Sequence, residues 1–226
     1  MKLLYKGKTK DVFENADGTI TLKLKDDATG KDGVFDPGEN AVGLSIEGLG
    51  RESLKLSAYY FELLKSKKVP THYLGCDLSE ATMRVLPAKI FGKGLEFVCR
   101  LKSCGSFLKR YGTYTSFGAD LHHFVEVTLK DDEKLDPPIT QDALTTLRIM
   151  TSVEYKACKN LSKQIAKIIA ADLSKKGLEL YDIKFEFGKN EETIMLIDEI
   201  SAGCMRVYKG GEPVAPMELA RLVIGA

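Results

Sequence analysis

At 226 residues, the chain can form one large domain or two small ones, and either arrangement can bury a substantial core. Its formal net charge is +1, which excludes the strong basic field typical of proteins that bind nucleic acid or an anionic membrane. No apolar run approaches the ~18 residues of a membrane span, and the start "MKLLYKGKTK" is too charged for a signal peptide, so we expect a soluble, cytoplasmic protein.

The first segments predict antiparallel sheet. "LLYKGKTKDVF" reads as two strands joined by a turn at Gly7, and a hairpin around Asp17 and Gly18 follows in "NADGTITLKLKDD". Lys8 and Lys10 are expected on one face of the second strand, where glycine would let backbone N–H groups approach an anion. Two exposed lysines of a surface hairpin remain the alternative.

The next region predicts a long loop, a helix and two strands. Residues 26–50 are dense in Gly, Asp and Pro, so they are expected to form a functional loop. A helix follows and ends before Pro70, and residues 71–86 predict two short strands. Pro87 and the glycines of 87–94 suggest a hinge, which predicts an N-terminal lobe over 1–87 and a C-terminal lobe over 88–226.

In the second half, strands are expected at 95–101 and 123–129, and the strongest helix at 152–177. Between the strands, "CRLKSCGSFLKRYG" predicts a turn and a short helix capped by Ser106, so that Arg100, Ser106 and free amides could bind an anion. A capped helix with a solvated basic end is the other interpretation. Core packing explains the apolar positions of the long helix, which are Val153, Ala157, Leu161, Ile165, Ile168, Ile169 and Leu173.

Cysteine and histidine do not suggest a metal centre of their own. The cysteines are odd in number and form no C-x-x-C pair, which argues against a zinc site and a disulfide framework. His122 and His123 are adjacent in a strand-like run, where buried or edge histidines are the more common interpretation.

The strongest chemical pattern is "LELYDIKFEFGKNEETIMLIDEIS", which predicts two strands joined by a polar turn. Alternation places Asp182, Lys184 and Glu186 on one face of the first strand and apolar residues on the other. With a five-residue turn, Gly188 opposes Ile194, and Glu186 becomes the diagonal neighbour of Asp198 at roughly 7 to 8 Å. Two such carboxylates suit a nucleotide-bound Mg²⁺. A four-residue turn would send Asp198 to the other face, and cross-strand salt bridges remain an alternative.

Five motifs in order resemble the phosphoribosylaminoimidazole-succinocarboxamide synthase (SAICAR synthetase) family. They are "YKGKTKDVF", "KDDATGKDG", "CRLKSCGSFLKRYG", "LKDDEKLDPPI", and "DIKFEFG" with "LIDEIS". The resemblance implies an α+β, two-lobed fold related to ATP-grasp and protein-kinase-like architectures, with antiparallel sheets, packed helices and ATP in the cleft. It also implies an ATP-dependent ligase of purine biosynthesis, which joins L-aspartate to carboxyaminoimidazole ribonucleotide, requires Mg²⁺ and forms homo-oligomers.

The resemblance assigns roles to individual residues. Lys8, Lys10 and Lys89 would contact ATP, and Glu186 and Asp198 would hold Mg²⁺. Asp182 and Lys184 would lie beside the reacting centre as catalytic residues. The expected substrate-binding residues are Arg100, Ser106, Lys130, Asp136 and Arg206.

The chain departs from the family pattern at several positions. Leu101 replaces the Asn that follows Arg100, and Gly203 stands where an aspartate is usual, while the sequence given ends with "PMELARLVIGA". These changes leave room for a paralogous ligase with another acceptor or amine. A nucleotide-binding module without catalysis is a third interpretation, disfavoured because Lys8, Lys10 and the residues of the acidic strands are retained.

Overall fold

The computed structural model describes residues 1–39 and 41–225. Contacts between residues group the chain into two compact units. Unit 1 comprises residues 1–88, 199–204 and 214–226, and unit 2 comprises residues 89–198 and 205–213. A single division after residue 87 would separate the segments 199–204 and 214–226 from the unit with which they have most of their contacts.

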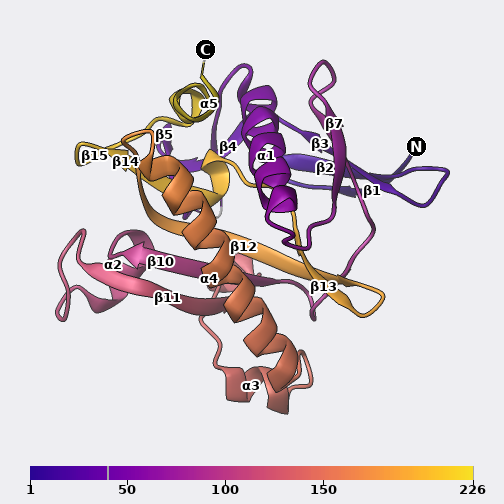
Figure 1. Cartoon of the computed structure of the whole chain (residues 1–226). Coiled ribbons are helices and arrows are strands. Elements are labelled where there is room, and N and C mark those ends of the chain that lie inside the picture. Colours follow the sequence, from indigo (N-terminus) through magenta and orange to yellow (C-terminus); the bar gives the residue numbers. More distant parts are fainter. Residues whose placement is uncertain (40, 226) are drawn as a thin grey trace. The chain divides into compact units, whose positions relative to one another are not determined.

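An antiparallel sheet with strand order β1-β2-β3-β8-β7 is the main sheet of unit 1 (Figure 1). Its strands are β1 (Lys2–Lys6), β2 (Lys10–Glu14), β3 (Ile20–Leu24), β7 (Tyr73–Asp77) and β8 (Thr82–Val85). The hairpins predicted from the first segments and from residues 71–86 are confirmed. Lys8 is an exception, because it lies in the turn before β2 and only Lys10 is part of that strand.

A second sheet of unit 1 replaces the loop predicted over residues 26–50. Its strand order is β5-β4-β6, with strands β4 (Asp27–Lys31), β5 (Val34–Phe35) and β6 (Val42–Ser45). A Cβ on Gly43 would lie 2.4 Å from the backbone of Gly30, so glycine permits the close approach of the two strands. The glycines that suggested a loop therefore allow the strands to pack closely.

Helix α1 (Leu49–Ser66) supplies much of the core of unit 1. It ends before Pro70 as predicted, and it packs against β3, β7 and α5 (Pro216–Ile224). Leu54, Phe61 and Leu64 are fully buried along one side of the helix, each contributing roughly 1.5 to 3 kcal/mol of burial free energy. Asp26 accepts hydrogen bonds from the backbone N–H groups of Gly48 and Gly50, which satisfies part of the helix N-terminus.

Unit 2 is built on a larger antiparallel sheet. Its main path is β11-β10-β12-β14-β15, and both β13 and β9 pair with β12. The strands are β9 (Lys89–Ile90), β10 (Leu95–Lys102), β11 (Asp120–Leu129), β12 (Glu179–Asn190), β13 (Thr193–Ile197), β14 (Met205–Lys209) and β15 (Glu212–Pro213). The predicted strands at 95–101 and 123–129 and the predicted strand pair after 178 are therefore confirmed.

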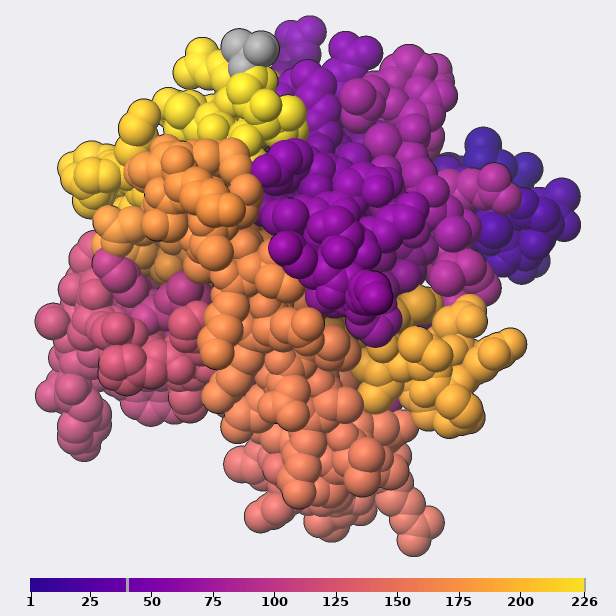
Figure 2. Space-filling model, in the orientation of Figure 1, coloured from indigo at the N-terminus to yellow at the C-terminus, as the bar shows by residue number. Residues whose placement is uncertain are grey.

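Helix α4 (Ser152–Ser174) covers β10 and β12, and its outer side is at the surface (Figure 2). Thr151 and Glu154 form a capping box at its start. Ile165, Ile169 and Leu173 are fully buried as predicted, whereas Val153 is 77% exposed and does not belong to the core. The remaining helical segments of unit 2 are α2 (Gly105–Tyr111), η1 (Asp132–Lys134) and α3 (Gln141–Thr146).

The predicted α+β class with antiparallel sheets and packed helices is confirmed. Among the described residues, no helix is long and apolar enough to cross a membrane. The sheet of unit 2 brings together most of the charged residues that the sequence analysis selected.

Candidate functional site

Strand β12 is the scaffold of the candidate site. Ile183 and Phe185 on one face are buried and belong to the core beneath α4. Asp182, Lys184 and Glu186 alternate with them and therefore lie on the opposite face, as predicted. Since a rigid, internally packed strand carries all three charged groups, their spacing is set by the backbone rather than by flexible loops.

Arg100 on β10 is the central cation of the first charged cluster. Its Nη1 donates to Asp182 Oδ2 at 2.7 Å, and its Nη2 donates to Ser106 Oγ at 2.9 Å. Its Nε donates to Glu126 Oε1 at 2.8 Å. The side chain of Arg100 is only 3% exposed, so these contacts are desolvated and the guanidinium is held in one orientation.

Ser106 was expected to cap α2, and this prediction is wrong. The helix is capped at Cys104 without a side-chain hydrogen bond, and Ser106 Oγ instead accepts from Arg100. The predicted convergence of Arg100 and Ser106 is thus present, although the geometry of the turn differs from the expectation.

Arg206 on β14 completes this cluster from the other side of β12. Its Nη1 donates to Asp182 Oδ2 at 2.8 Å, so Asp182 bridges Arg206 and Arg100. A Cβ on Gly105 would lie 2.7 Å from Arg206 Cζ, and Gly105 also has a φ of 51°. Glycine is therefore required where the guanidinium packs against the start of α2.

Glu126 on β11 also belongs to this cluster, although the sequence analysis did not select it. Its carboxylate accepts from Arg100 and also from Arg110 Nη2, at 2.7 and 2.6 Å to its two oxygens. A single acid within the apolar run "FVEVTL" was the available signal, because an unpaired buried carboxylate would be unfavourable. Three arginines and two carboxylates leave this cluster with a formal charge of +1, which suits an anionic ligand.

Cys104 lies beside this cluster but is not a candidate nucleophile. Burial raises the pKa of its thiol to about 12, and the negative charge of Asp182 adds to the effect. The thiol is thus protonated at neutral pH.

Lys184 is the centre of a second cluster. Its Nζ donates to Glu96 Oε1 at 2.8 Å, and Thr128 Oγ1 donates to Glu96 Oε2 at 3.2 Å. Burial by itself lowers the pKa of Lys184, but the negative charges of Glu96, Glu186 and Asp198 outweigh it and raise the pKa above its ordinary value. Lys184 is therefore a stable cation at neutral pH. Glu96 was also missed, and its signal was again an isolated acid in an apolar strand.

Glu186 is paired with Lys130 Nζ at 2.5 Å, and its side chain is 13% exposed. Asp136 lies in the turn that follows Lys130, where its Oδ1 accepts from the backbone N–H of Asp131 at 2.8 Å. Lys130 is therefore brought to the acidic strand, while Asp136 has a contact that shapes the turn.

The five-residue turn is not present between β12 and β13, and their register has the parity of the alternative, in which position 198 falls on the other face. Gly188 opposes Met195 rather than Ile194, because only two residues connect the paired ends of the strands. If the ladder continued, Asp198 would face away from Glu186, but pairing stops at Ile197 and Asp198 has a φ of 69°. Strand alternation therefore does not set its direction. Asp198 and Glu186 both act electrostatically on Lys184.

Carboxylates that could serve a metal are few in number. Within residues 1–39 and 41–225, no group of three or more His, Cys, Asp or Glu side chains is arranged to hold a metal ion. Glu186 and Asp198 offer the one or two carboxylates that Mg²⁺ takes when waters and phosphates complete its coordination. This donor set fits a nucleotide-bound Mg²⁺ and does not fit an all-protein site.

In unit 1, the first expected ATP ligands are Lys8, in the turn between β1 and β2, and Lys10, at the start of β2. A Cβ on Gly7 would lie 2.5 Å from the carbonyl oxygen of Lys10, so this tight turn requires glycine. Lys25 Nζ donates to the Gly7 carbonyl at 2.6 Å and pairs with Asp11 at 3.0 Å. Lys10 Nζ donates to Glu199 Oε1 at 2.9 Å.

Lys89 lies apart from these lysines in the sequence and in the grouping of the chain. It belongs to β9 of unit 2, where it is exposed and opposes Lys189 of β12. The contacts within each unit therefore do not bring Lys89 together with Lys8 and Lys10.

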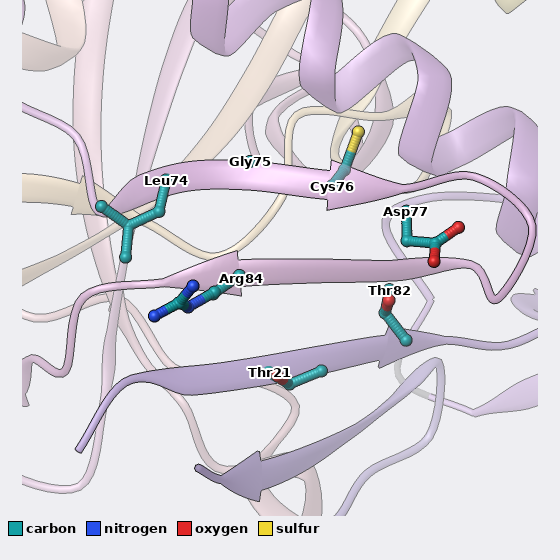
Figure 3. A pocket seen from close by; sticks show the side chains of 7 residues that line it. All are labelled: Thr21, Leu74, Gly75, Cys76, Asp77, Thr82 and Arg84. Carbon is teal, nitrogen blue, oxygen red and sulfur yellow. The ribbon is translucent and has the colours of Figure 1, made fainter. Parts of the chain in front are cut away.

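A shallow pocket of about 570 Å³ lies on the main sheet of unit 1 (Figure 3). None of the residues that line it was selected as a site residue from the sequence. They are Thr21, Leu74, Gly75, Cys76, Asp77, Thr82 and Arg84. Arg84 pairs with Asp17, and Asp77 Oδ1 accepts from Ser79. The charged groups of this pocket therefore pair with nearby residues and do not converge on a ligand.

Comparisons with known proteins agree with the resemblance seen in the sequence. The family model described as SAICAR synthetase matches residues 3–215. A phosphoribosylaminoimidazole-succinocarboxamide synthase of Clostridium tetani is 57% identical, over 99% of this chain and 100% of that protein. Its counterpart in Thermotoga maritima is 35% identical, over 92% of this chain and 86% of that protein.

A solved structure described as SAICAR synthetase (Type-2) in complex with ADP has a TM-score of 0.86. It is 27% identical and covers 98% of this chain and 97% of its own. The similarity in sequence and in fold extends over nearly the whole chain and includes both units. The chain belongs to the SAICAR synthetase family.

Proposed function

We propose that this protein is an ATP-dependent ligase that joins L-aspartate to the carboxylate of 5-amino-1-(5-phosphoribosyl)imidazole-4-carboxylate. The products are SAICAR, ADP and phosphate, in purine biosynthesis in the cytoplasm. One observation carries the proposal beyond family membership. Three alternate residues of β12, Asp182, Lys184 and Glu186, each contact charged side chains from neighbouring strands and turns, as a site for several charged substrates requires.

The ribonucleotide is assigned to the arginine cluster. Arg206 and Ser106 would bind its phosphate. Arg100 would hold the side chains of Asp182 and Ser106 in place through its hydrogen bonds to both. Arg206 is 17% exposed while Arg100 is 3% exposed, which favours Arg206 as the more direct ligand. Lys130 and Asp136 are assigned to the side of the site that receives the amino acid.

ATP and Mg²⁺ are assigned to the remaining charged residues. Lys8, Lys10 and Lys89 would contact ATP, and Glu186 and Asp198 would hold Mg²⁺ with the help of the ATP phosphates. The ion would neutralise charge on the transferring phosphoryl group. We assign the same task to Lys184, because its raised pKa keeps it protonated.

The order of bond changes follows from the chemistry of a carboxylate. A carboxylate is a poor electrophile, so its oxygen would first take the γ-phosphoryl group of ATP and release ADP. The amine of aspartate would then attack the acyl phosphate, forming the amide bond and releasing phosphate. Such a reaction depends on positioning and electrostatics, for which this set of lysines and arginines is suited.

The test is release of ADP by the full-length protein, measured with and without the ribonucleotide and with a panel of amino acids. We expect ADP release to require both the ribonucleotide and L-aspartate. Preference for another amine would indicate a paralogous ligase, to which Gly203 and Leu101 point as departures from the family pattern. Absence of turnover with every amine would contradict the proposal.

The arginine assignment has a separate test. Arg206→Ala should raise the KM for the ribonucleotide far more than the KM for ATP, with Arg221→Ala on the exposed side of α5 as the control. Equal effects on the two KM values would remove Arg206 from the ribonucleotide site.

A further inference from the structure

Glu199 is a largely buried acid that the proposed reaction does not use. Its side chain is 11% exposed, and it accepts a hydrogen bond from Lys10 Nζ at 2.9 Å, while the side chain of Lys10 is 16% exposed. The two residues are 189 positions apart in the sequence, yet both belong to unit 1. Lys10 is one of the lysines assigned to the ATP phosphates, so the direction of its ammonium group matters for ATP binding.

Hydrogen bonds join the segment that carries Glu199 to helix α1. The backbone N–H of Ile200 donates to Ser57 Oγ at 3.2 Å, and Ser57 Oγ donates to the Ile200 carbonyl at 3.1 Å. Cys204 Sγ donates to the Glu199 carbonyl at 3.7 Å. Ser57 is fully buried, so these contacts hold the backbone from the Glu199 carbonyl through Ile200. The backbone that carries the Glu199 carboxylate is therefore held in place, and the flexible side chain of Lys10 is hydrogen-bonded to this carboxylate.

We propose that Glu199 is a positioning residue that holds Lys10 ready for the ATP phosphates, an inference that rests on the phosphate role assigned to Lys10. A lysine side chain has a long flexible stem, and a ligand that must immobilise it loses affinity. Fixing one such side chain in advance is worth about 2- to 12-fold in affinity, given 0.5 to 1.5 kcal/mol per side chain.

Glu199 could also weaken ATP binding, and the direction of the change in a variant distinguishes the two effects. A carboxylate close to the triphosphate repels it, so a Glu199 that acted only through its charge would weaken ATP binding. Removal of the charge would then strengthen binding. Positioning and repulsion therefore predict changes in opposite directions for the same variant.

The experiment compares Glu199→Gln with Glu62→Gln, which removes a charge from the exposed side of α1. We expect Glu199→Gln to raise the Kd for ATP and the KM for ATP by about 3- to 10-fold. The KM values for the ribonucleotide and aspartate should stay within about twofold, because a general loss of structure would move all three. Glu199→Asp, which keeps the charge on a shorter stem, should lie between the wild type and Glu199→Gln.

Glu199→Gln in a Lys10→Met background measures the coupling between Glu199 and Lys10. If Glu199 acts through Lys10, Glu199→Gln changes ATP binding no further in that background. An undiminished loss there, or ATP binding by Glu199→Gln that equals or exceeds that of the wild type, would overturn the inference. If Lys10→Met itself leaves ATP binding unchanged, the assigned phosphate role of Lys10 fails, and the positioning role fails with it, while ADP release that depends on both substrates would still stand.

Discussion

Replacing Glu126 by glutamine is expected to destabilise the protein by about 3 kcal/mol, because it removes one of the two carboxylates that balance the buried guanidinium of Arg100. The side chain of Glu126 is 8% exposed and that of Arg100 is 3% exposed, so water cannot replace the lost carboxylate. Breaking a buried pair from one side costs roughly 3 to 5 kcal/mol, and the amide oxygen of glutamine retains one acceptor, which favours the lower end.

Arg110 provides the matched comparison, since it contacts the same carboxylate but is 31% exposed. Arg110→Gln should cost only about 0 to 1 kcal/mol, because its side chain is partly solvated when the contact is absent. The difference between the two variants thus measures the burial of Arg100 rather than the mere presence of an ion pair.

Urea denaturation and thermal unfolding measure both variants. For a chain of this length, 3 kcal/mol corresponds to a fall in Tm of about 6 to 12 °C, at 2 to 4 °C for each kcal/mol. Added salt should change the Arg110→Gln difference more than the Glu126→Gln difference, because exposed pairs are screened. A fall in Tm below about 2 °C for Glu126→Gln, or equal losses in the two variants, would refute the assigned energetics.

Three further predictions concern the metal, the ribonucleotide and the thiols. Glu186→Gln or Asp198→Asn should abolish turnover while the protein remains folded, and normal rates across a Mg²⁺ titration would reject the metal role. Gly105→Ala should raise the KM for the ribonucleotide, because the new Cβ would collide with the guanidinium of Arg206; an unchanged KM would show that Arg206 does not act there. In the folded protein, a thiol reagent should label the exposed Cys76 rapidly and the other cysteines slowly, as peptide mapping can check. Raising the pH from 7 to 9 should not make the three buried thiols whose pKa is about 12 reactive, since both pH values lie well below that pKa.

The alternation of charged and apolar residues on β12 could be predicted because side chains of any strand point to opposite faces in turn. The two long helices, α1 and α4, could also be predicted, since apolar residues recur at helical spacing and Pro70 limits the first of them. Residues 26–50 misled the prediction, because Gly30 and Gly43 were read as loop residues although they permit two strands to approach closely.

The partners of the charged residues were decided by tertiary structure. The pairing of β12 with β13 depends on how many residues the turn uses, and a change of one residue reverses the predicted face. The direction of Asp198 depends on a left-handed backbone conformation that follows the last pair of the ladder. Lys10 and Glu199 meet across 189 positions, and Arg100 meets Asp182 across 82. The sequence by itself determined which charges the chain carries and on which elements, whereas only folding selected their partners, because local periodicity contains no information about contacts between distant strands.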